Sequence, residues 1–313
     1  GIRLEAYEKM KKEVLTRFPG INIGNILEQE APDLLTGLYG AYPLEVMLGH
    51  EMRYFDNAWP ACREALLSDE EFNSYKAPEP SSTSTMEEIL KQMDRIEELT
   101  GTIEGFINYQ GVLNIAFKLR GQTIFMDMFD NPEATDNLFT EIASFIVKVA
   151  KIIYARQEEA GVVRDFIDVG NCTVNMAGPE AYDRYLFPRD LQIRKEFPHF
   201  GVHNCAWEVD PYMDTYSKIE GLGYLDMGFY SDLKRAKELF PEARRNVLYT
   251  SVDLANKTEE GLREDFRRIA EEIAPCDVGL PDIEIDVPDE RIMFAAELCE
   301  EFGNVYGSTK NVS

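Results

Sequence analysis

Two kinds of segment alternate along the chain from about residue 100 onward. Short apolar runs with β-branched and aromatic residues are typical of buried parallel strands, and longer amphipathic runs rich in Glu, Lys and Arg separate them. Repeated strand–helix–strand units imply right-handed crossovers and a parallel sheet. The expected strands cover residues 101–108, 164–170, 200–205, 223–228, 246–253 and 276–284.

Capping residues mark the beginnings of the helices expected between these strands. Ser231-Asp232, Thr258 and Pro288-Asp289 each precede an amphipathic run, where such residues favour a first helical turn. The succession of strands and helices has no long break, which favours a closed (β/α)8 barrel of the TIM type over an open doubly wound sheet. No Gly-rich dinucleotide motif or Walker loop follows an expected strand.

The length of 313 residues permits either two ordinary domains or one barrel. We expect residues 1–60, helical at first and then rich in Tyr, Pro and Gly, to form an N-terminal helical cover within the same domain. Residues 61–313 are expected to form the barrel. The chain begins with Gly rather than Met, which is compatible with a tag remnant or with missing upstream residues, including a first strand.

The charge balance excludes several classes of partner. The chain has 32 Lys and Arg against 57 Asp and Glu, a formal net charge of −25, with 44% hydrophobic residues. This composition predicts a globular protein whose surface repels phosphate backbones and anionic lipids, so we expect no nucleic acid and no membrane partner. The sequence shows no membrane-length apolar run and no signal-peptide core, so a cytoplasmic location is expected. Five widely spaced cysteines do not suggest a disulfide framework.

The tripeptide His203-Asn204-Cys205 closes one expected strand. Side chains alternate along a strand, so His203 and Cys205 are expected on one face. Cys276 follows 276 − 205 = 71 residues later, and its strand can lie across the carboxyl-terminal mouth of a barrel, where sites form. One imidazole and two thiolates suit zinc and leave a fourth position for water or substrate. A buried Cys is also commonly a core residue, so the spacing alone leaves both interpretations open.

Two stretches of the chain resemble a known superfamily. Residues 201–241, GVHNCAWEVDPYMDTYSKIEGLGYLDMGFYSDLKRAKELFP, and residues 274–292, APCDVGLPDIEIDVPDERI, resemble the C-terminal half of the uroporphyrinogen decarboxylase superfamily. They are most similar to its cobamide-dependent methyltransferases, which serve methanol, methylamine, chloromethane and methoxylated aromatic compounds. That branch binds a catalytic zinc through a His-x-Cys and a later Cys, which His203, Cys205 and Cys276 match. The resemblance extends from about residue 40 to the end.

The decarboxylase that names the superfamily differs from this chain at one important place. Its N-terminal Arg-Gln-Ala-Gly-Arg stretch, which supplies arginines for the carboxylates of a tetrapyrrole, is missing here; the nearest basic residue is Arg53. A polycarboxylate substrate entering a chain of charge −25 would need a concentrated basic pocket. Metal-free decarboxylation of uroporphyrinogen therefore stays an alternative rather than the main hypothesis.

The resemblance implies an enzyme that moves a methyl group between a small substrate and a corrinoid (cobalamin) cofactor. No Asp-x-His-x-x-Gly corrinoid motif is present, so a separate corrinoid-binding protein is expected to supply it. Zinc with such ligands can stabilise an ether or alcohol leaving group, or it can bind a thiol acceptor. A non-catalytic, ligand-binding barrel is the remaining alternative. The donor, the direction of transfer and the oligomeric state stay open.

Aromatic residues at the expected strand ends favour a methoxylated aromatic substrate and O-demethylation. A flat phenyl ether would suit an aromatic wall, although such residues are also common in packing. Asn108 and Gln110 are candidates for hydrogen bonds to the substrate. The residues expected to bind the substrate are Asn108, Tyr109, Trp207, Tyr230 and Tyr249.

Several further polar residues are candidates for supporting roles. The fourth zinc position is expected to be filled by Cys172, Asp168 or water. A metal-bound His usually donates its second ring N–H to an oxygen acceptor. The candidates for this acceptor are Asp226, Asp253, Asp282 and Glu284. Arg120 is expected to pair with a carboxylate.

Overall fold

The computed structural model describes residues 2–21, 31–56, 58, 60–63 and 66–306. Its contacts group the chain into two compact units, residues 30–201 and residues 1–29 with 202–313. The expected division into a cover of residues 1–60 and a barrel of residues 61–313 stays a prediction.

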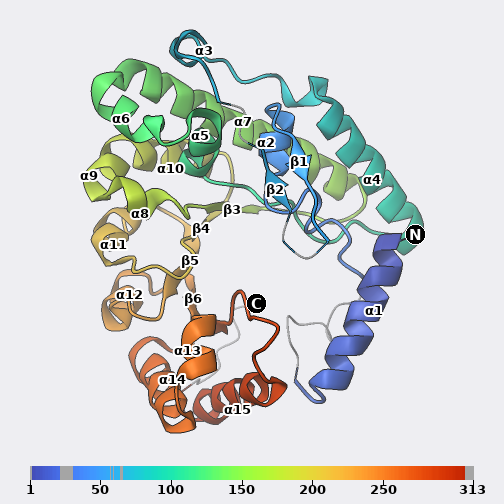
Figure 1. The fold of residues 1–313 in the computed structure, drawn as a ribbon, viewed down its shortest axis with the longest axis vertical. Helices are drawn as coiled ribbons and strands as arrows, with labels where there is room; N and C mark the ends of the chain where they lie inside the picture. The colour runs from blue at the N-terminus through green and yellow to red at the C-terminus, as the bar shows by residue number, and fades with distance from the viewer. Residues whose placement is uncertain (1, 22–30, 57, 59, 64–65, 307–313) are drawn as a thin grey trace. The chain divides into compact units, whose positions relative to one another are not determined.

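The unit of residues 30–201 is mainly helical around one long helix (Figure 1). Helix α7 runs for 28 residues and packs against α5, α6 and α10. Its apolar side recurs at helical spacing through Leu138, Ile142 and Phe145, all of them buried. The elements are α2 (Pro43–Met47), β1 (Met52–Arg53), β2 (Ala61–Cys62), α3 (Asp69–Asn73), η2 (Pro80–Ser82), α4 (Ser84–Thr100), α5 (Val112–Arg120), α6 (Thr123–Asp130), α7 (Pro132–Glu159), β3 (Phe166–Gly170), α8 (Val174–Ala177), α9 (Pro179–Ala181), η3 (Tyr182–Leu186) and α10 (Phe187–Arg194).

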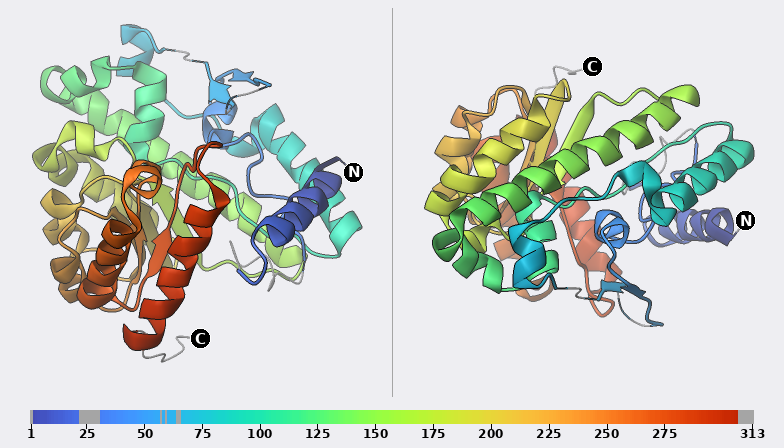
Figure 2. Two further views of the ribbon diagram at one scale, coloured as in Figure 1. Left: turned by 60° about the horizontal axis from the view of Figure 1, so that its bottom comes forward. Right: turned by 90° about the horizontal axis from the view of Figure 1, so that it is seen from above.

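The other unit contains parallel strands joined by helices. Strand β4 (His199–His203) crosses the boundary between the units. Figure 2 shows α14 and α15 side by side, and the two helices are in contact. The remaining elements are α1 (Ile2–Arg17), η4 (Asp210–Tyr212), α11 (Met213–Tyr216), β5 (Leu222–Gly228), α12 (Leu233–Leu239), β6 (Arg244–Leu248), α13 (Ser251–Asn256), α14 (Glu259–Ile273), β7 (Asp277–Gly279) and α15 (Asp289–Tyr306).

The register of the parallel strands places polar side chains of three strands at one level. Strand β5 pairs with β6, and β6 pairs with β7. In this register Asp226 is opposite Asn246, and Asn246 is opposite Asp277. Because residues at one level of a parallel sheet lie side by side, Asp226 has neighbours on the next strand that can support it.

The parallel sheet confirms the α/β class, but it is smaller than expected. In the described ranges it has five strands, in the order β3-β4-β5-β6-β7, rather than the eight of a complete barrel. Residues 101–108 do not form a strand, and this segment is followed by a single bridge from Gln110 to Gly170. Gly101 and Gly105 adopt φ values of 79° and 97°, which interrupt an extended ladder.

The expected strand of residues 246–253 is shorter than the sequence pattern indicated. Strand β6 ends at Leu248, and Thr250 caps α13 by accepting the N–H of Asp253 at 3.1 Å. The other helix starts are confirmed. Asp232 accepts the N–H of Arg235 at 3.0 Å, and Thr258 accepts that of Gly261 at 3.1 Å. Across the part of the chain that the structure describes, no helix has both the length and the apolarity needed to cross a bilayer.

Candidate metal centre

His203 and Cys205 lie together at the carboxyl end of β4. His203 is the last residue of the strand, and its Nε2 lies 3.3 Å from Cys205 Sγ. The predicted convergence is confirmed, but strand alternation does not produce it. Cys205 has φ of 56°, in the left-handed region, so a tight turn brings its thiol back toward the imidazole. The turn thereby presents a nitrogen and a sulfur donor at the end of the sheet where sites of parallel folds form.

A buried carboxylate fixes the orientation of the His203 ring. His203 Nδ1 is in hydrogen-bond contact with Asp226 Oδ2, and the Asp226 side chain is 1% exposed. A carboxylate accepts hydrogen bonds, so Nδ1 carries the proton and donates it. The proton-bearing Nδ1 leaves Nε2 as the ring nitrogen with a lone pair, on the side of Cys205. Metal-binding histidines typically have this arrangement, and it selects Asp226 from the four candidate acceptors.

Further hydrogen bonds hold Asp226 in place. Its Oδ1 accepts the backbone N–H of Asn204 at 2.6 Å, and its Oδ2 accepts the hydroxyl of Tyr224 at 3.2 Å. Asn246 Nδ2 donates to Tyr224 Oη at 3.1 Å. The side chain of Asn204 donates to the Asp226 carbonyl at 2.9 Å and accepts the Tyr216 hydroxyl at 2.8 Å. The carboxylate therefore has little freedom to rotate away from the imidazole.

The turn that carries Cys205 packs closely on the end of β5. Gly228 donates its N–H to the carbonyl of Trp207 at 3.0 Å. A Cβ at residue 228 would lie 2.2 Å from the Ala206 carbonyl oxygen and 2.7 Å from its carbon. Because these atoms belong to the backbone, the contact could be relieved only by moving the turn. Gly228 therefore sets the position of the Cys205 thiol.

Gly228→Ala is expected to destabilise the protein by about 2 kcal/mol, the usual cost of overpacking, and to weaken metal binding. Denaturant unfolding and zinc titration would measure both effects. Gly303→Ala is the matched control, because a Cβ there meets nothing within 4 Å. A Gly228→Ala protein with wild-type stability and zinc affinity would show that the turn is not fixed by this contact.

Cys172 and Asp168 were the candidates for the fourth zinc position. Asp168 lies on β3 and Cys172 follows this strand, both in the unit of residues 30–201. His203 and Cys205 lie in the other unit. One imidazole nitrogen and one thiol are soft donors that suit a metal such as zinc. The pair could therefore take part in binding a metal ion, and the roles of Cys172 and Asp168 stay predictions.

The loop that carries Cys172 is held by polar contacts on both sides. Thr173 donates its N–H to Asn114 Oδ1 at 3.0 Å, and Asn171 Nδ2 donates to Asp190 Oδ2 at 3.1 Å. Burial raises the pKa of Asp190 to about 6, although hydrogen bonds from Tyr182 and Asn171 oppose the rise. These contacts fix the Cys172 loop to the surrounding core of the same unit.

A row of amide side chains reaches the same loop from the predicted substrate residues. Gln110 Nε2 donates to Asn108 Oδ1 at 2.9 Å, and Asn114 Nδ2 donates to Gln110 Oε1 at 2.5 Å. Asn114 is buried on α5 and was not predicted. A single amide within the apolar run VLNIAF was the available signal, because helices seldom bury an amide that has no partner.

The structure does not bring Cys276 to the pair of His203 and Cys205. Cys276 precedes β7 rather than following it, so it comes at the amino end of its strand. With Cys299 it lines a cavity of about 360 Å³ bounded by residues of α14 and α15. Burial raises the pKa of the Cys276 thiol to about 12. The proposed role of Cys276 as a ligand stays a prediction.

The predicted aromatic residues differ in exposure. Tyr109 is buried, and its ring meets that of Tyr154 edge-on, with 6.1 Å between the ring centres. Trp207 is half-buried, and the centre of its ring lies 5.2 Å from that of Tyr212. Its Nε1 has no acceptor among the described residues. Tyr230 is exposed. The packing interpretation thus fits Tyr109, and the role of each residue in substrate binding stays a prediction.

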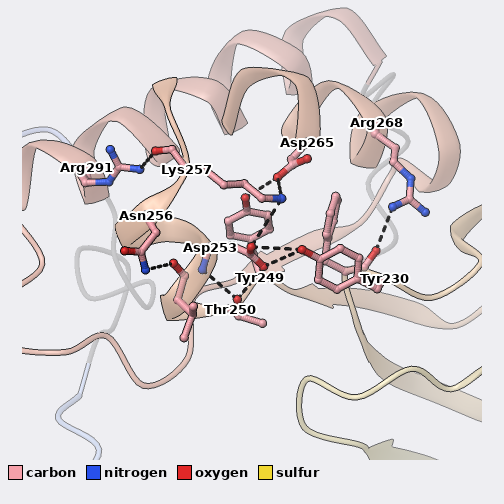
Figure 3. Close-up of polar contacts among 11 residues, drawn as sticks. Tyr230, Tyr249, Thr250, Asp253, Asn256, Lys257, Asp265, Arg268 and Arg291 are labelled. Carbon is pink, nitrogen blue, oxygen red and sulfur yellow. Dashed lines mark hydrogen bonds and ion pairs between the residues drawn. The ribbon is translucent and has the colours of Figure 1, made fainter. Parts of the chain in front are cut away.

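Tyr230 and Tyr249 belong to a polar cluster at the carboxyl ends of β5 and β6 (Figure 3). Tyr249 is fully buried, and its hydroxyl donates to Asp265 at 2.5 Å. The Tyr230 hydroxyl donates to Asp253 at 3.2 Å. Lys257 donates to Asp265 at 2.5 Å and lies 5.6 Å and 5.7 Å from the centres of the Tyr230 and Tyr249 rings. These contacts connect the strand ends to α13 and α14.

Comparison with known proteins shows what this fold is similar to. No protein-family model matches the chain, and no curated protein matches it. Among solved structures, a methyltransferase from Methanosarcina mazei matches with a TM-score of 0.64 and 17% identity, over 85% of this chain and 80% of that one. A B12-independent methionine synthase from Shewanella sp. W3-18-1 matches with a TM-score of 0.43 and 11% identity, over 83% and 75% of the two chains. The chain shares the α/β fold of the first protein.

Proposed function

We propose that the protein is a zinc-dependent methyltransferase that moves a methyl group from a small methylated substrate to a corrinoid supplied by a partner protein. The best candidate substrate is a methoxylated aromatic compound, which would be O-demethylated. The observation that carries the proposal is the His203–Cys205 pair, with His203 Nε2 toward the thiol and Nδ1 bonded to buried Asp226. The fold shared with a methyltransferase supports it.

The chemistry of the donors fits zinc. His203 and Cys205 would hold the ion, with Cys276 or Cys172 as a third ligand. Zinc bound there would act as a Lewis acid toward the oxygen of an ether or alcohol. Asp226 keeps the imidazole in the tautomer that can bind, and Asn204 and Tyr224 keep Asp226 in place.

The metal content of the purified protein tests the site. We expect about one zinc per chain, as for sites with three protein ligands, and loss of zinc in Cys205→Ala. Cys172→Ala and Cys276→Ala identify the third ligand, since only one of these substitutions should lower the zinc content. Cys299→Ala is the control, because Cys299 lines the same cavity as Cys276 but has no proposed contact with the metal. A wild-type protein without zinc after growth in zinc would contradict the proposal.

Methyl transfer tests the reaction itself. The zinc-loaded protein is incubated with 1,2-dimethoxybenzene and cobalamin reduced to the Co(I) state. The expected product is methylcobalamin, followed by its absorbance, together with the free phenol. Formation of methylcobalamin from methanol but not from the ether would keep the enzyme class and change the substrate. No product with any methyl ether, alcohol or amine would contradict the function.

A further inference from the structure

A cavity of about 360 Å³ lies between β7, α14 and α15, within the unit of residues 1–29 and 202–313. Among the described residues along its wall, none is His203, Cys205 or Asp226. Pockets that bind small molecules usually have volumes of about 300 to 1,000 Å³ and mainly apolar walls. The cavity is therefore of the size that a small molecule can occupy.

Two packed helices provide the apolar wall of the cavity. Phe266 and Ile269 come from α14, and Leu298 and Phe302 come from α15. Their spacings of three and four residues place each pair on one face of its helix, and all four side chains are buried. The two helices are in contact and lie side by side in Figure 2. The wall is thus already formed in the unliganded protein.

The strand at the cavity is less covered than its neighbours. Helices usually bury both faces of a parallel sheet. Strands β5 and β6 contain fully buried residues, whereas every residue of β7 is half-buried, including Val278 at the cavity. Arg245 fixes the adjacent wall, because it donates to the carbonyl of Pro275 at 3.0 Å and to that of Phe240 at 2.8 Å. The cavity is consequently a gap between elements that are held in place.

The charges along the wall favour an uncharged ligand. Asp277 is the only charged residue among the described residues of the wall, and it pairs with Arg244 at 2.5 Å. Cys276 and Cys299 contribute thiols, which behave as small apolar groups. A buried anion would therefore find no cationic partner there, and a cation would compete with Arg244 for Asp277. The phenylalanine rings of the wall favour an aromatic ligand.

Gly303 leaves the opening of the cavity free. Gly303 and Cys299 are four residues apart on one face of α15, and both are exposed and line the cavity. A Cβ at residue 303 would meet nothing within 4 Å, so packing does not require a glycine at this position. Glycine also weakens a helix. A longer side chain would stand over the opening, which the glycine keeps accessible.

We propose that this cavity is a binding site for an uncharged aromatic molecule of one or two rings, which enters past Cys299 and Gly303. The site lies within one unit and does not depend on the proposed methyl transfer. A dry apolar cavity of about 150 Å³ can hold benzene, so about 360 Å³ has room for two fused rings. Burial of the ligand against Phe266 and Phe302 would supply the affinity.

Indole is the probe for this site, because it is uncharged and has two fused rings. Calorimetric titration of the full chain should show that indole binds. Indole-3-carboxylate should bind at least about 10-fold more weakly, because its charge would be buried without a partner. At about ten times its Kd, indole should slow the alkylation of Cys299 by iodoacetamide about 10-fold, since only the unliganded protein reacts.

Gly303→Leu tests where indole binds. The leucine side chain would cover the opening and should abolish binding, and the variant should fold because the position is open and Leu favours a helix. Asn304→Leu is the matched control, because Asn304 is the next residue of α15, is exposed and does not line the cavity. Cys299→Leu is a second blocking variant, and thermal unfolding shows whether each variant is folded.

The results decide the proposal without zinc or corrinoid, so a failure of methyl transfer would not affect it. Loss of indole binding in Gly303→Leu, with normal binding in Asn304→Leu, supports the site. A wild type that binds no indole would overturn it. Wild-type affinity in the folded blocking variants, or unchanged alkylation of Cys299, would place indole elsewhere and overturn it too. Equal affinity for indole-3-carboxylate would overturn the choice of an uncharged ligand.

Discussion

Asp226→Asn is expected to weaken zinc binding by about 10- to 100-fold, the usual effect of losing the acceptor behind a metal-bound histidine. The wild-type carboxylate accepts three hydrogen bonds, from His203 Nδ1, the Tyr224 hydroxyl and the Asn204 backbone N–H. An Asn side chain has one oxygen and one NH2 group, so in either orientation a donor faces a donor. The imidazole then either rotates or moves its proton to Nε2, where it blocks the metal.

Competition with a chromophoric zinc chelator would measure this affinity. Tyr224→Phe removes the longest of the three hydrogen bonds and should have a smaller effect. Asp214→Asn is the control, because Asp214 is exposed and pairs with Arg235 at the surface. An Asp226→Asn variant that binds zinc as tightly as the wild type would mean that His203 is oriented by something other than this carboxylate.

Arg120→Met is expected to destabilise the protein by about 3 kcal/mol or more, because it leaves a buried carboxylate unpaired. Arg120 donates to Asp127 at 2.7 Å, to the carbonyl of Leu67 at 3.0 Å and to Asp69 at 2.5 Å. It also lies 4.6 Å from the centre of the Phe72 ring. Asp127 is only 4% exposed, so the loss of its partner is not compensated by water.

Denaturant unfolding of three variants would separate the ion pair from packing. Arg120→Met should lose the most stability, and the double variant Arg120→Met with Asp127→Leu should regain much of the loss, because a buried pair replaced by apolar residues is often neutral. Asp69→Asn should have a small effect, since its side chain is 86% exposed. Equal stability of Arg120→Met and the wild type would contradict the assignment of a buried pair.

Local signals in the sequence predicted the elements that depend on local chemistry. The caps Asp232 and Thr258 begin helices as expected, because a cap needs only its own side chain and the next turn. The pairing of Arg120 with a carboxylate was also correct. His203 and Cys205 are only two residues apart, so the sequence could predict that their side chains converge. The physical cause was different from the one expected, because the left-handed backbone of Cys205, rather than strand alternation, brings them together.

Long-range features were less accessible. The sequence could not show that Cys276 precedes its strand, because β7 is only three residues long and the apolar run around it continues on both sides. Cys172 is closer to His203 in the sequence than Cys276 is. It lies in a Gly-Asn-Cys turn, however, where no hydrophobic periodicity indicates the direction of its side chain. The importance of Asn114 arises from what surrounds it once buried, which composition and periodicity do not encode.

The cluster around Lys257 has a consequence for which of its residues can change during evolution. Tyr249 and Lys257 share Asp265, so a change at either residue would leave a charged or polar group without its partner. Tyr230 is attached to the cluster through its hydroxyl and a ring contact, and it is exposed. Natural substitutions should therefore accumulate at Tyr230, while Tyr249 and Lys257 should change rarely or together.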